Sequence, residues 1–444
     1  MSRFDGDDLL PLARHVLERA RALGADEVSV SVSRGSHVTI QRRDRMVEQA
    51  TEAITQGLVL ALLADDRYTS NATSDLRPEA LEPFIARCVQ TASFIEPDPY
   101  RRLPDAALCG RGVSEEALDQ DDPAWGRRTA SDRAAQAEAI EEAILASART
   151  DQVSCSSYVA DGRGETVRVL SNGFADRTSG AWFSAGGDIT LSEGDRRPEA
   201  GASYSARHLS DLPDPEQIAA AAQERVAHRL GSGAAPSGAY PMLLENRCAG
   251  RILGVLAAPM SGSALHQGRS CLMDRLGTQI ASEHLTLIDD PTIPRGLGSQ
   301  PWDGDCLIAR PRTLIEGGVL RSYNIGVYFA RKLGVEPTGG GRSNWVIAPG
   351  ERDLQQMAAE LDRAVLVTGF LGGNSNPSTG DFSYGIRGLL LERGEIVQSL
   401  SEMNVSGNIL QLLGQLVEVG SDVWGWSSVR APTLRFEGVQ FSGT

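Results

Sequence analysis

Histidine and cysteine are the residues of this chain with the clearest metal-binding chemistry, and both are sparse. The histidines are His15, His37, His208, His228, His266 and His284. The cysteines are Cys88, Cys109, Cys155, Cys248, Cys271 and Cys306. A catalytic zinc site needs three protein ligands and a water, and a helix aligns two imidazoles only at a spacing of three or four residues. No histidine pair has that spacing and no Cys-x-x-Cys occurs, so we predict reduced, mostly structural thiols. One combination stays open, in which His266, Cys271 and His284 approach one another in the fold.

Two other polar clusters could bind ions, but structural roles are the better interpretation of both. The pair Asp289-Asp290 with Asp303 and Asp305 could offer oxygen ligands to Mg²⁺ or Ca²⁺, although turn and N-cap roles are favoured beside Pro291 and Gly304. The run Gly339-Gly-Gly-Arg342 could hold a phosphate or carboxylate, but a flexible turn is the better interpretation.

The most distinctive stretch runs from Gly369 to Glu395 and is rich in glycine. A buried-strand pattern, Ala364–Thr368, leads into a loop of Gly, Asn, Ser and Pro, and the apolar run Ile386–Leu391 follows it. Glycines in such a loop let the backbone approach another chain or a ligand. Ser383 resembles the serine of a nucleophile elbow, but the preceding glycine is one position too far away and no His-acid partner is evident. As candidates for a peptide cavity or an interface we select Gly372, Gly373, Gly380, Asp381, Phe382, Ser383, Tyr384 and Gly385.

Composition excludes several classes of function. The chain has 444 residues and a net charge of −15, which argues against a nucleic-acid or anionic-membrane surface. Lys332 is the single lysine and is followed by Leu333, so a Walker A loop is excluded. The N-terminus shows no signal sequence, and the longest apolar run, Leu58–Ala64, is too short to span a bilayer. We therefore expect a cytoplasmic protein.

The elements that must position these residues are predicted from periodicity. Apolar residues at helical spacing predict helices over 9–23, 78–93, 131–149 and 215–230, and alternation predicts strands between them. Asp161-Gly162 and Asn172-Gly173 are interpreted as turns. We expect an N-terminal α+β module over 1–95, a linker or excursion over 96–124, a middle α+β module over 125–230, and a linker over 231–239.

Residues 240–444 are expected to form a C-terminal domain. Its pattern alternates short strands and glycine turns, including strands over 304–308 and 364–368, with helices near 249–258, 326–333, 354–361 and 409–419. This pattern favours a strongly curved, barrel-like, mainly antiparallel sheet, so the predicted fold class is α+β.

Several segments of this domain resemble the TldD/PmbA family, within it the PmbA (TldE) branch. The resemblance is densest in Gly380-Asp-Phe-Ser-Tyr-Gly385, Glu392-Arg-Gly394 and Met403-Asn-Val-Ser-Gly-Asn408. Further landmarks occur in the same order: Ser261-Gly262, Gly268-Arg-Ser270, Leu287–Pro291, Gly296–Ser299, Leu314–Leu320, Tyr328–Gly334, Thr338-Gly339 and Ala431–Leu434. The N-terminal similarity rests on strand order and Ser171-Asn-Gly173.

The resemblance implies a partnership. Proteins of this family are reported as pairs of paralogous subunits that form a heterodimeric zinc peptidase acting on unfolded peptides. In the TldD branch the zinc is held by a His-Glu-x-x-x-His helix and a distant cysteine. The corresponding positions here read Glu245-Asn-Arg-Cys-Ala-Gly-Arg251, without histidine, and Ser421-Asp-Val-Trp-Gly-Trp-Ser-Ser428, without cysteine.

We therefore expect a non-catalytic subunit with no cofactor of its own, whose TldD-like partner carries the zinc. A heterodimer is expected, a homodimer is possible, and the substrate would be an unfolded peptide. Two alternatives stay open: an autonomous metallopeptidase with unfamiliar ligands, and a peptide-binding scaffold without proteolysis.

Overall fold

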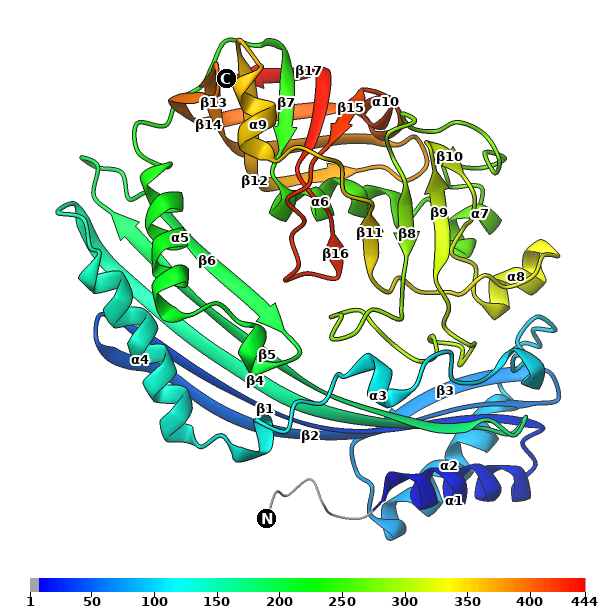
Figure 1. The fold of residues 1–444 in the computed structure, drawn as a ribbon. Helices are drawn as coiled ribbons and strands as arrows, with labels where there is room; N and C mark the ends of the chain where they lie inside the picture. Colours follow the sequence, from blue (N-terminus) through cyan, green and yellow to red (C-terminus); the bar gives the residue numbers. More distant parts are fainter. Residues whose placement is uncertain (1–7, 444) are drawn as a thin grey trace.

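The computed structural model describes residues 8–443, and the first half of this range builds one curved antiparallel sheet (Figure 1). Its six strands lie in the order β3-β2-β1-β4-β5-β6. Their bounds are β1 Glu27–Arg43, β2 Met46–Ala64, β3 Arg67–Thr73, β4 Gln152–Leu170, β5 Ala175–Leu191 and β6 Glu199–Ala206. The pairing of β1 with β4 joins strands from the predicted modules 1–95 and 125–230 into one sheet. The predicted division into modules stays a prediction, but the two segments share this sheet.

Four helices cover the ends of the sheet. These are α1 Leu9–Ala22, α2 Pro78–Ala92, α4 Ala130–Ala146 and α5 Pro215–Ala227. Val167 and Val169 of β4 pack in one apolar cluster with α1 and α2, whereas Cys155 and Val159 pack with α4 and α5. These four β4 residues have the same parity and so point to the same face, because strand side chains alternate. The opposite face meets the C-terminal half near the end of β4, where Arg168 donates to the carbonyl of Gly304.

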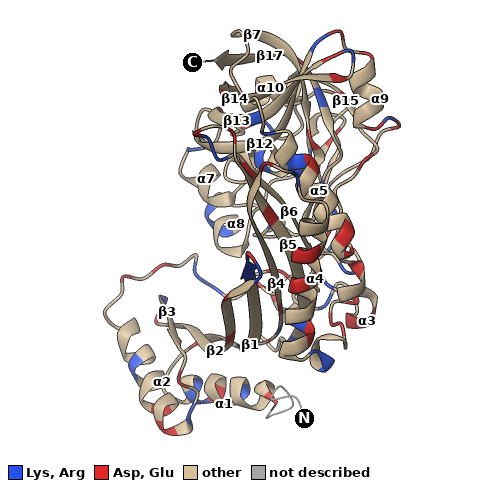
Figure 2. Cartoon of the chain, turned by 90° about the vertical axis from the view of Figure 1, so that its left-hand side faces the viewer, with Lys and Arg blue, Asp and Glu red and all other residues tan. Residues whose placement is uncertain are grey.

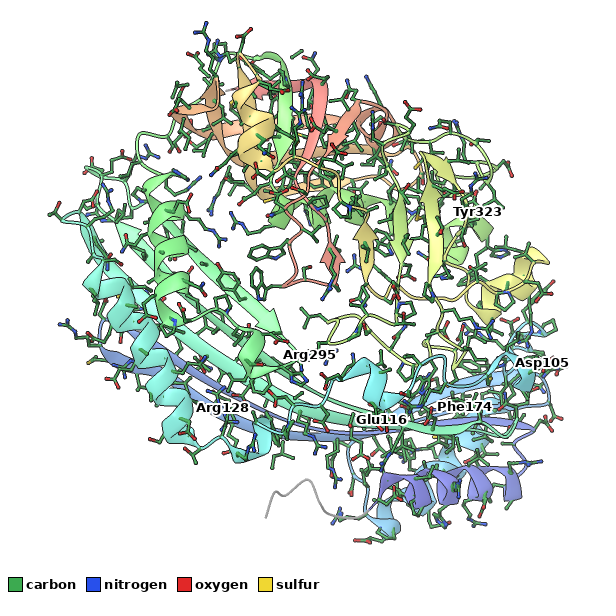
Figure 3. The ribbon with its side chains drawn as sticks, viewed as in Figure 1. Asp105, Glu116, Arg128, Phe174, Arg295 and Tyr323 are labelled. Carbon is green, nitrogen blue, oxygen red and sulfur yellow. The ribbon has the colours of Figure 1, made fainter. Side chains whose placement is uncertain are left out.

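The predicted linker over 96–124 packs between the two halves of the molecule. It contains the short helix α3 Glu115–Leu118. Cys109 forms a β-bridge with Leu307, and Gln120 Nε2 donates to the carbonyl of Ser299 at 2.7 Å. Arg295, labelled in Figure 3, donates to Asp119 at 2.6 Å and to Asp211 at 3.0 Å. The segment therefore fixes the C-terminal half over the curved sheet.

The C-terminal half contains a closed barrel. Its five strands run in the order β14-β13-β12-β7-β17, and β14 pairs with β17 to close the ring. Their bounds are β7 Gly238–Leu244, β12 Ala364–Ser375, β13 Asp381–Glu392, β14 Glu395–Asn408 and β17 Leu434–Gly443; β15 Leu416–Val419 extends the sheet beside β17. All pairings are antiparallel except that of β12 with β7. The predicted α+β fold with a barrel-like, mainly antiparallel C-terminal sheet is confirmed.

A second, smaller sheet lies beside the barrel in the order β10-β9-β8-β11-β16. Its strands are β8 Leu287–Asp289, β9 Arg312–Glu316, β10 Val319–Leu320, β11 Trp345–Ile347 and β16 Val429–Arg430. The helices of this half are α6 Ala249–Leu253, α7 Gly262–His266, α8 Val327–Leu333, α9 Leu354–Ala359 and α10 Ile409–Gly414. Trp345 is fully buried and shares one large apolar core with residues of the barrel.

Several predicted elements are wrong. The helix expected over 409–419 ends at Gly414, and 416–419 form β15 instead, because this run pairs with β17. The strand expected over 304–308 is a loop with isolated bridges at Leu307 and Ile308 and with hydrogen bonds from the backbone of Asp305 and Leu307 to Asp303.

The expected turn at Asp161-Gly162 lies inside β4. A Cβ at residue 162 would lie 2.6 Å from Trp182 Nε1, so close packing rather than a turn requires this glycine.

Two further observations concern the ends and the membrane prediction. Residues 1–7, part of the stretch on which the expectation of no signal sequence was based, lie outside the described residues. Over residues 8–443, the helices are all too short or too polar to cross a bilayer.

Candidate functional site

The fold brings together the two segments at which the family resemblance places the zinc ligands of the TldD branch. Residues 245–251 begin a short 3₁₀ turn that continues into α6. Asn246 Nδ2 donates to the backbone carbonyl of Asp422 at 2.6 Å. The Arg247 guanidinium lies 6.0 Å from the centre of the Trp424 ring. Both segments therefore meet beneath the barrel, facing the curved sheet.

The polar side chains at this junction form ion pairs and hydrogen bonds with residues of the chain itself. Arg247 donates to both carboxylate oxygens of Glu245 at 2.5 and 2.6 Å. Asp422 accepts from Thr433 Oγ1 at 2.7 Å. Burial raises the pKa of the Cys248 thiol to about 12, so this sulfur keeps its proton at neutral pH. A guanidinium cation cannot ligate zinc, Glu245 is engaged by Arg247, and no histidine lies in either segment, so the residues at this junction do not supply the three protein ligands of a catalytic zinc site.

The metal-binding combination left open by the sequence is not assembled either. His266 packs against the ring of Phe329, with 6.1 Å between ring centres, whereas Cys271 lies beside Gly380. Within the part of the chain that the structure describes, no three His, Cys, Asp or Glu side chains are grouped to hold a metal ion.

The acidic cluster has structural partners. Asp289 accepts from Ser343 and from Arg312 Nη2 at 2.7 Å, and Asp303 accepts from the backbone of Asp305, Leu307 and Gly340. Burial raises the pKa of Asp303. Asp290 accepts from Thr292, and Asp305 caps the start of α8 through Val327. These roles match turn and cap functions rather than a cation site. The glycine run 339–341 forms a bend whose backbone joins this network, since Gly340 donates to Asp303 and Gly341 accepts from Arg312.

The eight residues selected from the glycine-rich stretch lie on one β-hairpin, and they divide into core and surface. Phe382 and Tyr384 are buried inside the barrel with rings 5.7 Å apart. Gly380 is buried, Gly385 is partly buried, and Gly372, Gly373, Asp381 and Ser383 are exposed. Arg251 of α6 lies over Tyr384, 4.7 Å from its ring centre. The loop expected here is shorter than predicted, since β12 continues to Ser375 and β13 starts at Asp381.

A pair of tryptophans joins the barrel half to the sheet. Trp424 and Trp426 lie in the loop that follows β15, and both pack on Tyr204 of β6 with ring centres 5.5 and 5.1 Å away. Trp426 Nε1 donates to the carbonyl of Asp211 at 3.0 Å. This loop extends from the barrel half toward β6 of the curved sheet (Figure 1).

A cavity of about 680 Å³ opens between α5 and β6 on one side and the outer wall of the barrel on the other. The barrel contributes Thr368, Gly369 and Phe370 of β12 and Arg387 of β13. The hairpin predicted as a candidate site thus supplies this wall, although through residues next to the eight selected ones.

Sequence reasoning missed the arginines of the cavity. Arg225 lies in the last turn of α5 and Arg229 lies two residues beyond the end of this helix at Ala227, and with their spacing of four residues both side chains line the cavity. That signal was present in the sequence. Arg387 carries no such signal, because only the fold brings it opposite α5.

Comparisons with known proteins agree with this architecture. Residues 237–443 match the family model described as the PmbA/TldA metallopeptidase C-terminal domain. The chain is 27% identical to the metalloprotease PmbA of Escherichia coli O157:H7, covering 94% of this chain and 93% of that protein.

Solved structures extend the similarity over almost the whole length. A protein from Bacteroides thetaiotaomicron named as a modulator of DNA gyrase is 36% identical, with a TM-score of 0.95 over 99% of this chain and 100% of that one. TldE from Thermococcus kodakarensis is 22% identical and shares the fold, with a TM-score of 0.87 over 97% of this chain and 100% of that one.

Proposed function

The chain belongs to the PmbA/TldD metallopeptidase family, and from this premise we propose that it is the non-catalytic subunit of a heteromeric peptidase. In this proposal a TldD-like paralogue carries the zinc, and the present chain forms part of a chamber that admits only unfolded peptides.

The observation that carries the proposal is the junction of Glu245–Arg251 with the tryptophan loop. The fold places these two segments together, as a zinc site divided between them requires, but the side chains there are an ion pair, an amide and a protonated thiol. Because the two segments meet in this fold without the histidines and the cysteine that the family resemblance places there, a supporting role fits this chain better than catalysis.

The cavity supports a role in holding an extended peptide. β6 is the last strand of the curved sheet, and Ala200 and Gly201 of this strand line the cavity. An extended segment can add to such an edge through backbone hydrogen bonds, whereas a folded domain cannot enter. The barrel side opposite offers the half-buried Phe370 and the exposed Ile396 as apolar contacts for peptide side chains.

The test begins with zinc content. The chain is purified alone at neutral pH, and zinc per chain is measured by elemental mass spectrometry beside a TldD-like paralogue treated in the same way. Structural zinc sites bind with about 10–16 kcal/mol, so a complete site keeps its metal through purification. We expect background zinc here and about one zinc per chain in the paralogue.

Activity is then measured with an unfolded peptide on each chain alone and on the reconstituted pair. Cleavage that needs both chains is the expected result. One zinc per chain in this protein, together with chelator-sensitive cleavage in the absence of the paralogue, would overturn the proposal in favour of an autonomous metallopeptidase.

A further inference from the structure

The cavity between α5 and the barrel contains more positive than negative side chains. Arginines at 225, 229, 247, 387 and 393 line it, together with glutamates at 224, 245 and 395. Glu245 forms an ion pair with Arg247, whose guanidinium donates short hydrogen bonds to both carboxylate oxygens. The protein as a whole carries a net charge of −15, and Figure 2 shows acidic residues along the neighbouring helix α4. A basic cavity in an acidic molecule is therefore a local feature.

Three of these arginines have no carboxylate partner. Arg225, Arg229 and Arg387 form no ion pair with any of the described residues 8–443. Arg225 donates a single hydrogen bond from Nη1 to the carbonyl of Gly201 at 3.0 Å. Arg229 Nε is buried and has no hydrogen-bond partner. A buried donor without a partner is costly, and a bound anion would satisfy it.

The arginines also repel one another. Burial and then the nearby Arg387 lower the pKa of Arg229, and burial and then Arg247 lower the pKa of Arg225. Glu245 and Glu224 act in the opposite direction on Arg225 and raise its pKa. The repulsion without a compensating carboxylate is therefore that between Arg229 and Arg387, on the two walls of the cavity. An anion between the walls would remove that repulsion and gain charge-assisted hydrogen bonds.

We propose that this cavity binds the carboxylate groups of an acidic segment in an extended peptide, with Arg225, Arg229 and Arg387 as the recognising residues. The proposal rests on the proposed function in one respect, namely that the ligand is an unfolded peptide. Guanidinium groups suit carboxylates because their donors pair with both oxygens at once.

The surroundings favour a peptide over other anions. Phe370 and Ile396 line the same cavity and offer apolar contacts that a free phosphate would not use. A nucleic acid would meet the repulsion of the acidic protein surface outside the cavity. A short peptide segment with acidic and apolar residues matches both kinds of wall.

The test uses the full chain alone and two fluorescent ten-residue peptides. One contains aspartate and glutamate among apolar residues, and the other carries asparagine and glutamine at the same positions. Fluorescence anisotropy at low salt gives both dissociation constants. We expect the acidic peptide to bind about tenfold more tightly or better, and this preference to weaken as salt rises.

Variants then assign the preference to the cavity. R225Q/R229Q is expected to reduce the affinity for the acidic peptide to that for the neutral one, and circular dichroism checks its folding. R387Q changes an exposed arginine, which makes unfolding no concern, and should lower the affinity for the acidic peptide severalfold. R87Q is the matched control, because Arg87 is exposed on α2 and distant from the cavity.

Equal binding of the two peptides would overturn the proposal. A preference for the acidic peptide that survives in R387Q and in folded R225Q/R229Q would also overturn it. So would tight binding of inorganic phosphate that displaces both peptides equally. Since no partner chain is present, failure of partner-dependent cleavage would count against the proposed function and leave this result intact.

Discussion

At Gly380 both the backbone and the surroundings exclude a side chain. Its φ is +82°, and a Cβ there would lie 3.2 Å from Asn408 and Ile409 and 3.3 Å from Cys271. We expect Gly380→Ala to lower the free energy of unfolding by about 2–4 kcal/mol, from the strained φ and from overpacking. Urea unfolding measures this.

Gly277 provides the matched control, because its φ is +77° and a Cβ added there would have no neighbour within 4 Å. Gly277→Ala should cost only about 1 kcal/mol, from the backbone alone. Equal losses in the two variants would show that packing around Gly380 is not what requires glycine.

At Asp161 the constraint is electrostatic rather than steric, because a charged carboxylate is buried there. Its carboxylate has no exposure and accepts from Arg133 at 2.6 and 2.9 Å, with Arg128 at 3.2 Å. Asp161→Asn should cost about 3–5 kcal/mol, since two buried arginines lose their counter-ion. Thermal unfolding tests this, with Asp151→Asn as the comparison: Asp151 pairs with the half-exposed Arg149, and its loss should leave the midpoint almost unchanged.

Two dipeptides that end in glycine show which turns could not be predicted from the sequence. Asp161-Gly162 and Asn172-Gly173 carry the same turn signal, yet only the second forms a turn. In the first, pairing to Val38 and Phe183 on either side keeps the strand extended. Such pairing is made by residues more than 100 and 20 positions away, so the local signal could not reveal it.

Among elements, the long amphipathic helices were predictable because each buries one face. Helix α1 was expected over 9–23 and spans Leu9–Ala22, and α5 was expected over 215–230 and spans Pro215–Ala227. For the barrel strands, the sequence pattern predicted only the buried segments. Their extensions, such as Gly369–Ser375 of β12, contain exposed glycines that read as loop, and only the hairpin pairing makes them strand.

The tryptophan loop gives a prediction at the scale of elements. Trp426 connects this loop to Tyr204 and to the backbone of Asp211. Trp426→Ala should accelerate amide hydrogen exchange by about tenfold or more in β6 and in 209–211, because contacts between the two halves are lost, while exchange in the barrel strands stays slow. Hydrogen–deuterium exchange with mass spectrometry locates the change.

Trp426→Phe separates packing from hydrogen bonding at this position. Phenylalanine keeps the aromatic contact with Tyr204 and loses only the donor to Asp211. An intermediate increase in exchange is expected. Uniformly faster exchange throughout the chain in Trp426→Ala would contradict a local role for the loop.

At the scale of the whole molecule, buried thiols in separate apolar clusters make the free energy of unfolding depend on pH above pH 9. Burial raises the pKa of Cys155 to about 11 and that of Cys306 to about 12, from an ordinary value of 9.0. Cys155 belongs to the cluster under α4 and α5, and Cys306 to the cluster between the sheet and the C-terminal half.

The sign of the pH dependence follows from these directions. The unfolded chain loses each thiol proton near pH 9, whereas the folded chain keeps it, so the unfolded state binds fewer protons above that pH. Stability is therefore full below pH 9 and falls as the pH rises toward 11. Each thiol should contribute a loss of about 1 kcal/mol between pH 9 and pH 10.

Urea titrations at pH 8, 9 and 10 give the free energy of unfolding and so measure this loss. The double variant Cys155→Ala/Cys306→Ala separates the contribution of the two thiols from that of other titrating groups. Alanine removes the titrating groups, so the variant should lose about 2 kcal/mol less than the original chain between pH 9 and pH 10, whatever its stability at pH 8. Equal slopes would mean that both thiols ionise alike in the folded and unfolded chains.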